Sequence, residues 1–391
     1  MKNILNYRER YYLLFVFISI QLLMVSLATI EPVLPLGEGV VVDQAIYSHL
    51  LMTGMFVLGY ALFSFFDKKE LLKTQATTEI ACISKNYMLF SLGLVVLGVI
   101  TSIASVWVVL PMKEYLNIIL ESPHRIGDVR NIVGTSGLPG FIKVFNYSPL
   151  AVLFVNASLF LYTNNDRKKI LTLLLIALLG VFVKVFFSLD RISLLGALSV
   201  LICLAYKAPR KFIYVLCVLG MVLLFPLWFI TNFRMNEMSI LDFLVLYAHL
   251  GMVNYQLLIE HFHNWSYGLN TFLMPVYFIG KAVGIEVDVP KATVSVWDNP
   301  QYFYGYLYMD FGWFSHGVVL VLGYLLGWFQ RNVVLRKKWA VLFFFIVQFL
   351  VLSTIVIPVC RATEFWLLIM ITVISGLLIE FKSKTYENNI R

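Results

Sequence analysis

Apolar residues run through this chain in long, almost uncharged stretches separated by short polar segments. A helix needs about 20 mostly apolar residues to cross a bilayer, and ten stretches reach or approach that length. They cover residues 11–30, 46–66, 87–110, 148–164, 170–189, 192–207, 212–231, 312–330, 340–358 and 364–381. The pattern predicts an all-α polytopic membrane protein with about ten transmembrane helices, built as a single integral membrane domain over residues 1–391.

Lysines and arginines between these stretches fall into two unequal groups. Twenty of the 30 lie in short segments on one side, the two chain ends included, and nine are spread over longer segments on the other side. Cytoplasmic segments carry the excess of positive charge in membrane proteins. Both termini are therefore predicted to be cytoplasmic.

Two long segments are then predicted on the outer face, residues 111–147 and a larger loop over 232–311. Long loops in compact proteins are usually functional. The cytoplasmic segments are short, and the chain has neither a GxxxxGK(S/T) nor a GxGxxG pattern, which excludes a nucleotide-driven machine. We therefore expect the function to lie on the outer face.

Residues 240–259 are long and apolar enough to span, and 267–284 is a possible return partner, which would give twelve spans. The turn between them, 260–266, would then face the cytoplasm without any Lys or Arg, against the positive-inside rule. Four polar side chains would also enter lipid, at a cost: Asp242, His249, Asn254 and Gln256. We predict helices that lie at the outer membrane interface instead.

Composition agrees with the membrane assignment. Hydrophobic residues make up 60% and charged residues 13% of the chain, against about 45–50% and 25% in soluble proteins. Because the positive charge of +8 follows from the cytoplasmic segments, no nucleic-acid partner is expected. The four cysteines lack paired spacing, and His261 and His263 lack acid or thiol partners, so we expect neither a disulfide framework nor a metal site.

Three arginines stand at the predicted outer boundary of the membrane, where positive charge is disfavoured. Arg191 lies in the turn between the fifth and sixth stretches, Arg234 opens the large loop, and Arg361 precedes the last stretch. A guanidinium is a permanently charged planar fork that suits phosphate and pyrophosphate oxygens. Together with Lys184, these arginines are candidates for a cradle that binds a lipid-linked phosphate.

A local role is the alternative for each of the three arginines, with a nearby acid or an ordinary lipid phosphate as its partner. Every one has an acid nearby in the sequence, and ion pairs at helix ends are common. The nearby acids are Asp190, Glu237 and Glu364.

The end of the large loop is polar and rich in aromatic residues. Aromatic faces stack on the C–H faces of sugars, and their polar edges form hydrogen bonds. The candidate sugar-binding residues are Trp297, Tyr302, Tyr304 and Tyr306. An interfacial aromatic belt is the alternative. The loop then enters the eighth stretch through Asp310-Phe311-Gly312, and the later Gly323-xxx-Gly327 spacing predicts helix packing.

These features together resemble a Wzy-type O-antigen polymerase, an enzyme that polymerises oligosaccharide repeat units. The resemblance lies in the spans with inside termini, the isolated outer arginines, and one late, dominant loop that runs through an aromatic stretch into Asp-Phe-Gly. In residues, it is concentrated at 188–196, 232–250 and 293–327.

The resemblance implies a glycosyltransferase of the bacterial inner membrane. It implies a substrate of undecaprenyl-pyrophosphate-linked oligosaccharide on the periplasmic face, surrounding membrane lipids, a possible chain-length regulator protein as partner, and no cofactor. The outer cations would stabilise the departing pyrophosphate. A general base must deprotonate the acceptor hydroxyl, and the candidates, in order, are Glu237, His249 and Asp298.

Two other functions remain open on the sequence. An O-antigen ligase shares the architecture but delivers the glycan to a lipid core, and it is expected to use a histidine such as His249 of the large loop. A polysaccharide flippase or transporter would bury charge at mid-membrane and show two matching halves.

Overall fold

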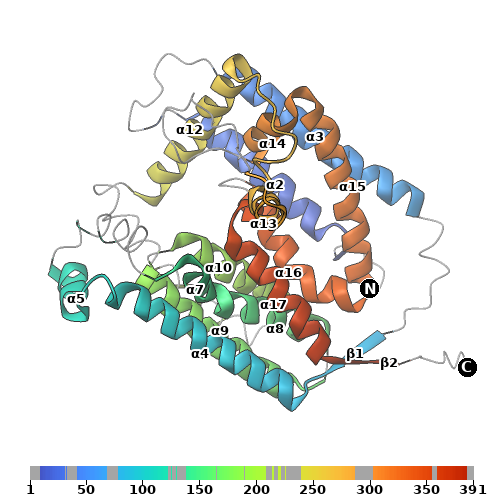
Figure 1. The fold of residues 1–391 in the computed structure, drawn as a ribbon. Helices are drawn as coiled ribbons and strands as arrows, with labels where there is room; N and C mark the ends of the chain where they lie inside the picture. The colour runs from blue at the N-terminus through green and yellow to red at the C-terminus, as the bar shows by residue number, and fades with distance from the viewer. Residues whose placement is uncertain are drawn as a thin grey trace, which may run out of the picture. The chain divides into compact units, whose positions relative to one another are not determined.

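Figure 1 shows the fold as a computed structural model in which helices dominate. The structure describes residues 9–30, 32, 42–67, 78–121, 125, 129, 138–163, 165–188, 190–207, 214, 219–221, 225, 239–286, 303–354 and 359–384. The chain divides into two compact units. Each unit is described by itself below.

Unit 1 comprises residues 1–76, 241–335 and 350–365. Its elements are α2 (Tyr12–Ala28), α3 (Asp43–Asp67), α12 (Ile240–His261), α13 (Leu273–Val283), α14 (Phe303–Phe311), η3 (Gly312–Phe314), α15 (Ser315–Val334) and η4 (Val359–Arg361). The last turn of α16 (Lys338–Ser353) and the first residues of α17 (Thr363–Leu378) also belong to it.

Helices α3 and α15 run side by side through unit 1 (Figure 1). Glycines allow their backbones to approach closely, because a Cβ atom at Gly59 would meet the Leu320 carbonyl and one at Gly323 would meet the Phe56 carbonyl. Gly327 likewise faces the Phe63 ring. The helix packing predicted from the Gly323-xxx-Gly327 spacing is therefore confirmed.

Unit 2 comprises residues 77–240, 336–349 and 366–391. Its elements are β1 (Thr78–Cys82), α4 (Lys85–Trp107), α5 (Met112–Glu121), α7 (Gly140–Lys143), η2 (Val144–Tyr147), α8 (Ser148–Tyr162), α9 (Arg167–Ser188), α10 (Arg191–Lys207), β2 (Glu380–Lys384) and most of α16 and α17.

A single proline joins three helices of unit 2. Pro149 near the start of α8 fills the space left by the missing side chains of Gly98 in α4 and Gly180 in α9. Ser148 beside it donates a hydrogen bond to the Leu94 carbonyl at 2.6 Å. Small residues thus let α4, α8 and α9 pack closely, as is common between membrane helices.

A two-stranded antiparallel ribbon pairs β1 with β2 in unit 2. The sequence analysis predicted helices only, and it extended the last apolar stretch to residue 381. The structure instead ends α17 at Leu378 and begins β2 at Glu380, with Phe381 opposite Ala81. The pairing of β2 with β1 thus ends α17 at a point where the sequence is still apolar.

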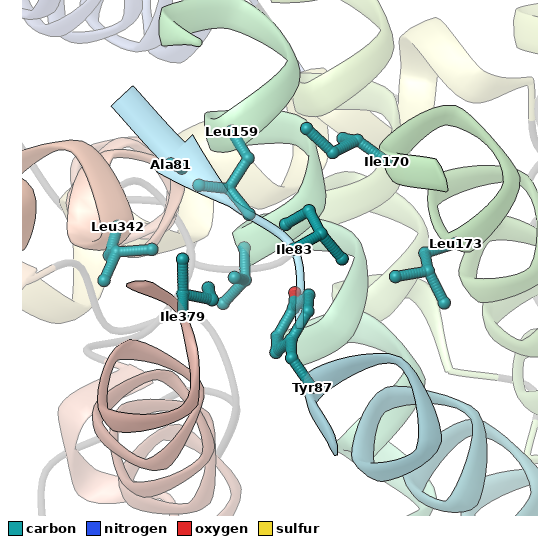
Figure 2. Packing of buried hydrophobic residues seen from close by; sticks show 9 residues of the cluster. Ala81, Ile83, Tyr87, Leu159, Ile170, Leu173, Leu342 and Ile379 are labelled. Carbon is teal, nitrogen blue, oxygen red and sulfur yellow. The ribbon is translucent and has the colours of Figure 1, made fainter. Parts of the chain in front are cut away.

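Figure 2 shows the core that this ribbon covers. Buried side chains from β1 and the start of α4, from α8, α9 and α16, and from the end of α17 meet there: Ala81, Ile83, Tyr87, Val155, Leu159, Ile170, Leu173, Leu342 and Ile379. Ser84 caps α4 by accepting the Tyr87 N–H at 3.1 Å, and it donates to the Leu378 carbonyl at 3.0 Å. The ribbon and the cap therefore hold the start of α4 next to the end of α17.

Six helices are long and apolar enough to cross a membrane, as judged by length and composition over the described residues. Five of them match predicted stretches: Asp43–Phe66, Lys85–Trp107, Gly140–Tyr162, Arg167–Ser188 and Phe303–Val334. Four further predicted stretches contain shorter apolar helices, of 10–17 residues. The stretch 212–231 lies almost wholly outside the described residues.

The sixth of these helices is α12, which the sequence analysis placed at the membrane interface. It is one regular 22-residue helix, and residues Leu241–His261 meet the same length and composition criteria. Its polar residues Asn254 and Gln256 are buried inside the protein, with 0% and 2% exposure. The argument that they would enter lipid therefore does not hold. The proposed return partner contains only the 11-residue α13, about half of a span.

Candidate functional site

The carboxylate of Asp310 organises a turn in unit 1. Asp310 is fully buried, and it accepts the backbone N–H groups of Asn270 and Thr271 at 2.7 and 2.8 Å. The hydroxyl of Ser266 also donates to it. A buried carboxylate with this many donors is well satisfied. Asp310 therefore holds the segment before α13 against the end of α14.

The glycine of Asp310-Phe311-Gly312 serves the same turn. Gly312 has a φ of +53°, a left-handed conformation that costs little only for glycine. A Cβ atom there would also collide with the Trp265 indole. In this chain, Asp-Phe-Gly is thus a structural joint between residues 265–272 and helix α15.

Arg361 is placed by the same turn. The preceding residue, Cys360, donates its thiol to the Thr271 carbonyl at 3.2 Å. Burial raises the pKa of this thiol to about 11, so it keeps its proton at neutral pH. Since Thr271 is itself fixed by Asp310, η4 and Arg361 are anchored to α14 through two hydrogen bonds.

The Arg361 guanidinium lies over the ring of Tyr306, with its Cζ atom 4.5 Å from the ring centroid. Such stacking is an attractive cation–π contact. No carboxylate among the described residues lies within ion-pair distance of Arg361, and this includes Glu364, the acid that the sequence offers as a local partner. Within the described part of the chain, the guanidinium thus has an aromatic ring and no acid as its partner.

Lys184 has a different setting, in unit 2. Its ammonium lies 2.6 Å from Oδ2 of Asp190, donates to the Ser193 hydroxyl and lies over the Tyr147 ring. The Tyr147 hydroxyl donates to the same carboxylate oxygen at 2.9 Å. Lys184 is 0% exposed. This geometry makes Lys184 one half of a local ion pair with Asp190, the acid that the sequence offered as a local partner for Arg191.

Asp190 also caps helix α10. Its Oδ1 atom accepts the Ile192 N–H at 2.9 Å, as N-cap aspartates do. Burial acts to raise the pKa of Asp190, but the Lys184 ammonium and the hydrogen bonds outweigh it and hold the pKa well below the usual value. Arg191 is the first residue of α10. The structure does not describe the side chain of Arg191.

His249 is the candidate base that the structure describes. It is partly buried on α12, and its Nδ1 atom lies 3.3 Å from the Ala28 carbonyl at the end of α2. A carbonyl only accepts, so Nδ1 is the donor in this contact, and the tautomer that carries only this proton has a lone pair on Nε2. The same contact also satisfies an orphan carbonyl at a helix end.

Tyr304 and Tyr306, both predicted to bind sugar, lie in α14 with 2% and 6% exposure. The Tyr304 hydroxyl is 3.2 Å from the Thr53 hydroxyl, and its ring meets the His49 ring at 4.7 Å. Tyr304 therefore packs between helices, whereas Tyr306 forms the platform beneath Arg361. The structure does not place Tyr304 on an open surface.

Two histidines inside predicted spans escaped the sequence analysis. His49 lies in α3 and His316 in α15, where Nε2 of His316 is 3.4 Å from the Ser48 hydroxyl, itself 2.7 Å from the Tyr255 hydroxyl. Ionisable residues within membrane helices are a signal of function in themselves. A count of charged residues does not reveal them, because histidine is taken as neutral in that count.

The remaining predicted site residues lie outside the described residues, so their predictions stand as made. They are Glu237, Asp298, Arg234, Trp297 and Tyr302.

Helices of this length and apolarity define an all-α, membrane-embedded protein. Comparison with protein-family models, with curated proteins and with solved structures finds no match for this chain.

Proposed function

We propose that this protein is a membrane glycosyltransferase that polymerises undecaprenyl-pyrophosphate-linked oligosaccharides at the periplasmic face of a bacterial inner membrane. One observation carries the proposal: the Arg361 guanidinium is stacked on Tyr306 and has no carboxylate partner among the described residues. It follows the pattern of isolated outer arginines on which the resemblance to the polymerases rests.

The chemistry assigned to Arg361 follows from its geometry. When the glycosidic bond to the carrier breaks, negative charge develops on the leaving pyrophosphate. Preorganised cations aimed at developing charge stabilise a transition state without reorganisation at that moment. The Tyr306 ring and the Cys360 anchor remove the rotamer freedom that an exposed arginine would lose on binding. Arg191 and Arg234 remain proposed as pyrophosphate-binding residues.

The acceptor hydroxyl must lose a proton as it attacks the sugar. An imidazole with a free lone pair is suited to accept it near neutral pH, and His249 has that form when Nδ1 donates to Ala28. Glu237 and Asp298 remain proposed alternatives. Lys184 takes no part in this proposal, because Asp190 already neutralises it.

The test is glycan laddering from the native host, comparing the wild type, a deletion and three point variants. We expect the deletion and Arg361→Ala to leave a single repeat unit on the lipid core. Arg361→Lys should restore the ladder only in part, because lysine keeps the charge but loses the planar fork and much of the stacking. Arg125→Ala is the matched control, since Arg125 is an exposed arginine of the predicted outer segment 111–147.

Three other results would change the proposal, each in a different way. Bare core with long chains on the carrier, seen in the deletion strain, would assign a ligase. An unchanged ladder in the deletion would exclude both enzymes and direct attention to transport. A full ladder with Arg361→Ala, together with a collapsed ladder in the deletion, would remove Arg361 from the site.

A further inference from the structure

Helix α13 exposes apolar side chains in several directions. Tyr277, Phe278 and Ile279 are consecutive and are 46%, 53% and 64% exposed, and Val283 is 62% exposed. Consecutive residues point about 100° apart around a helix, so these four do not form a single face. Only Gly280 of this helix is buried. The one charged residue of α13 is Lys281 in its last turn. A helix that exposes apolar side chains around most of its circumference belongs in a hydrocarbon environment.

Helix α13 is too short to cross a bilayer. It has 11 residues, which gives a length of about 16 Å against a hydrocarbon core of about 30 Å. It ends at Gly284, whose φ of +74° forms a left-handed cap, and the Ile285 N–H donates to the Gly280 carbonyl at 2.8 Å. A capped apolar helix of this length reaches into one leaflet only.

The beginning of α13 is tied to Arg361. Thr271 stands two residues before the helix, and its carbonyl accepts the Cys360 thiol. The short helix η4, which ends at Arg361, packs directly against α13. An apolar surface thus adjoins a guanidinium without a carboxylate partner in the described part of the chain. The apolar surface suits a lipid tail, and the guanidinium suits an anionic headgroup.

We propose that α13 and Arg361 together bind a polyprenyl phosphate carrier lipid, with the isoprenoid tail along α13 and the phosphate on Arg361. This inference deepens the proposed function and rests on it for the identity of the lipid. A pyrophosphate or terminal phosphate carries more charge than the phosphodiester of a bulk phospholipid. The polyprenyl carrier therefore fits a fixed guanidinium better than the surrounding lipid does.

The experiment measures binding of undecaprenyl phosphate to the purified full-length protein, by native mass spectrometry from detergent. The wild type is compared with Phe278→Ser/Ile279→Ser, with the milder Ile279→Ala, and with Arg361→Ala. Ile202→Ser is the matched control, because Ile202 on α10 is 67% exposed and equally apolar. Phosphatidylglycerol serves as the competing bulk lipid and inorganic pyrophosphate as the headgroup alone.

We expect the double serine variant to bind undecaprenyl phosphate at least tenfold more weakly than the wild type. A loss of this size corresponds roughly to removing one buried apolar side chain from the contact. Ile279→Ala should show a smaller loss in the same direction, and Ile202→Ser none. The double variant should bind pyrophosphate like the wild type, whereas Arg361→Ala should weaken the binding of both probes. Unchanged pyrophosphate binding also shows that the double variant is folded.

Two results would overturn the inference. In one, the double variant binds undecaprenyl phosphate as the wild type does. In the other, phosphatidylglycerol competes as well as undecaprenyl phosphate, so that α13 is an ordinary lipid contact. The ladder assay separates this outcome from the proposed function. A collapsed ladder in the deletion with unaltered binding in the α13 variants removes only the inference. Selective binding through α13 with an intact ladder in the deletion removes only the polymerase.

Discussion

Oδ2 of Asp310 lies 2.8 Å from the backbone nitrogen of Thr271, and the carbonyl of Thr271 in turn holds the Cys360 thiol beside Arg361. A buried carboxylate at the end of one helix thus sets the position of a guanidinium that lies about 50 residues further along the chain. This connection gives Asp-Phe-Gly a structural role in this chain.

Asp310→Asn should destabilise the protein by about 3 kcal/mol, because one of the two backbone N–H groups would then face an amide donor. It should also shorten the glycan ladder, because Arg361 would no longer be held in place through Thr271 and Cys360. Thermal unfolding in detergent checks the first expectation. Glu286→Gln, at an exposed acid, is the control and should be neutral. Equal melting temperatures for both variants would contradict the role given to Asp310.

Lys184→Met should cost about 3–5 kcal/mol, because it leaves the Asp190 carboxylate partly buried without its cation. The double variant Lys184→Met/Asp190→Asn should recover much of that loss, since no charge is then left unpaired. Unfolding midpoints measure this recovery. The glycan ladder of the double variant tests the function of Lys184. If the variant folds and still polymerises, Lys184 forms only a local ion pair. If it folds but does not polymerise, Lys184 belongs to the substrate site.

Acid should weaken the contribution of Asp190. Its pKa is depressed in the folded protein, so its stabilisation is present above the unfolded value of about 4 and is lost as the pH falls below it. The stability gap between wild type and Asp190→Asn should therefore be constant from about pH 7 to pH 5 and shrink by about 1 kcal/mol by pH 3. A gap that stays constant down to pH 3 would show that the carboxylate is not held in its charged form.

Gly323→Ala should destabilise the contact between α3 and α15 by about 1–3 kcal/mol, because the new methyl group would strike the Phe56 carbonyl. Gly317→Ala, on the same helix, has nothing within 4 Å of its Cβ position. It should be neutral or slightly stabilising, since alanine is the better helix former. Melting temperatures of the two variants provide the comparison, and equal effects would show that close backbone packing does not matter here.

The structure also shows where sequence reasoning was limited. The Gly323-xxx-Gly327 spacing predicted helix packing because two small residues one turn apart lie on the same helix face. The pairing of β1 with β2 had no such signal, since about 300 residues separate the strands. Likewise, the sequence offered Glu364 as a partner for Arg361, three residues away. The structure places the guanidinium over Tyr306 instead.

The sequence by itself determined the membrane character, most of the helices and the arginine that the proposed site is built around. These properties follow from the local length and apolarity of each segment, which the surroundings change little. Only the tertiary structure decided which polar groups are already satisfied. It paired Lys184 with Asp190, buried Asn254 and Gln256, turned Asp310 into an anchor and left Arg361 without an acid among the described residues. The physical reason is that a side chain's partners depend on which helices meet, and spacing along the chain does not record those meetings.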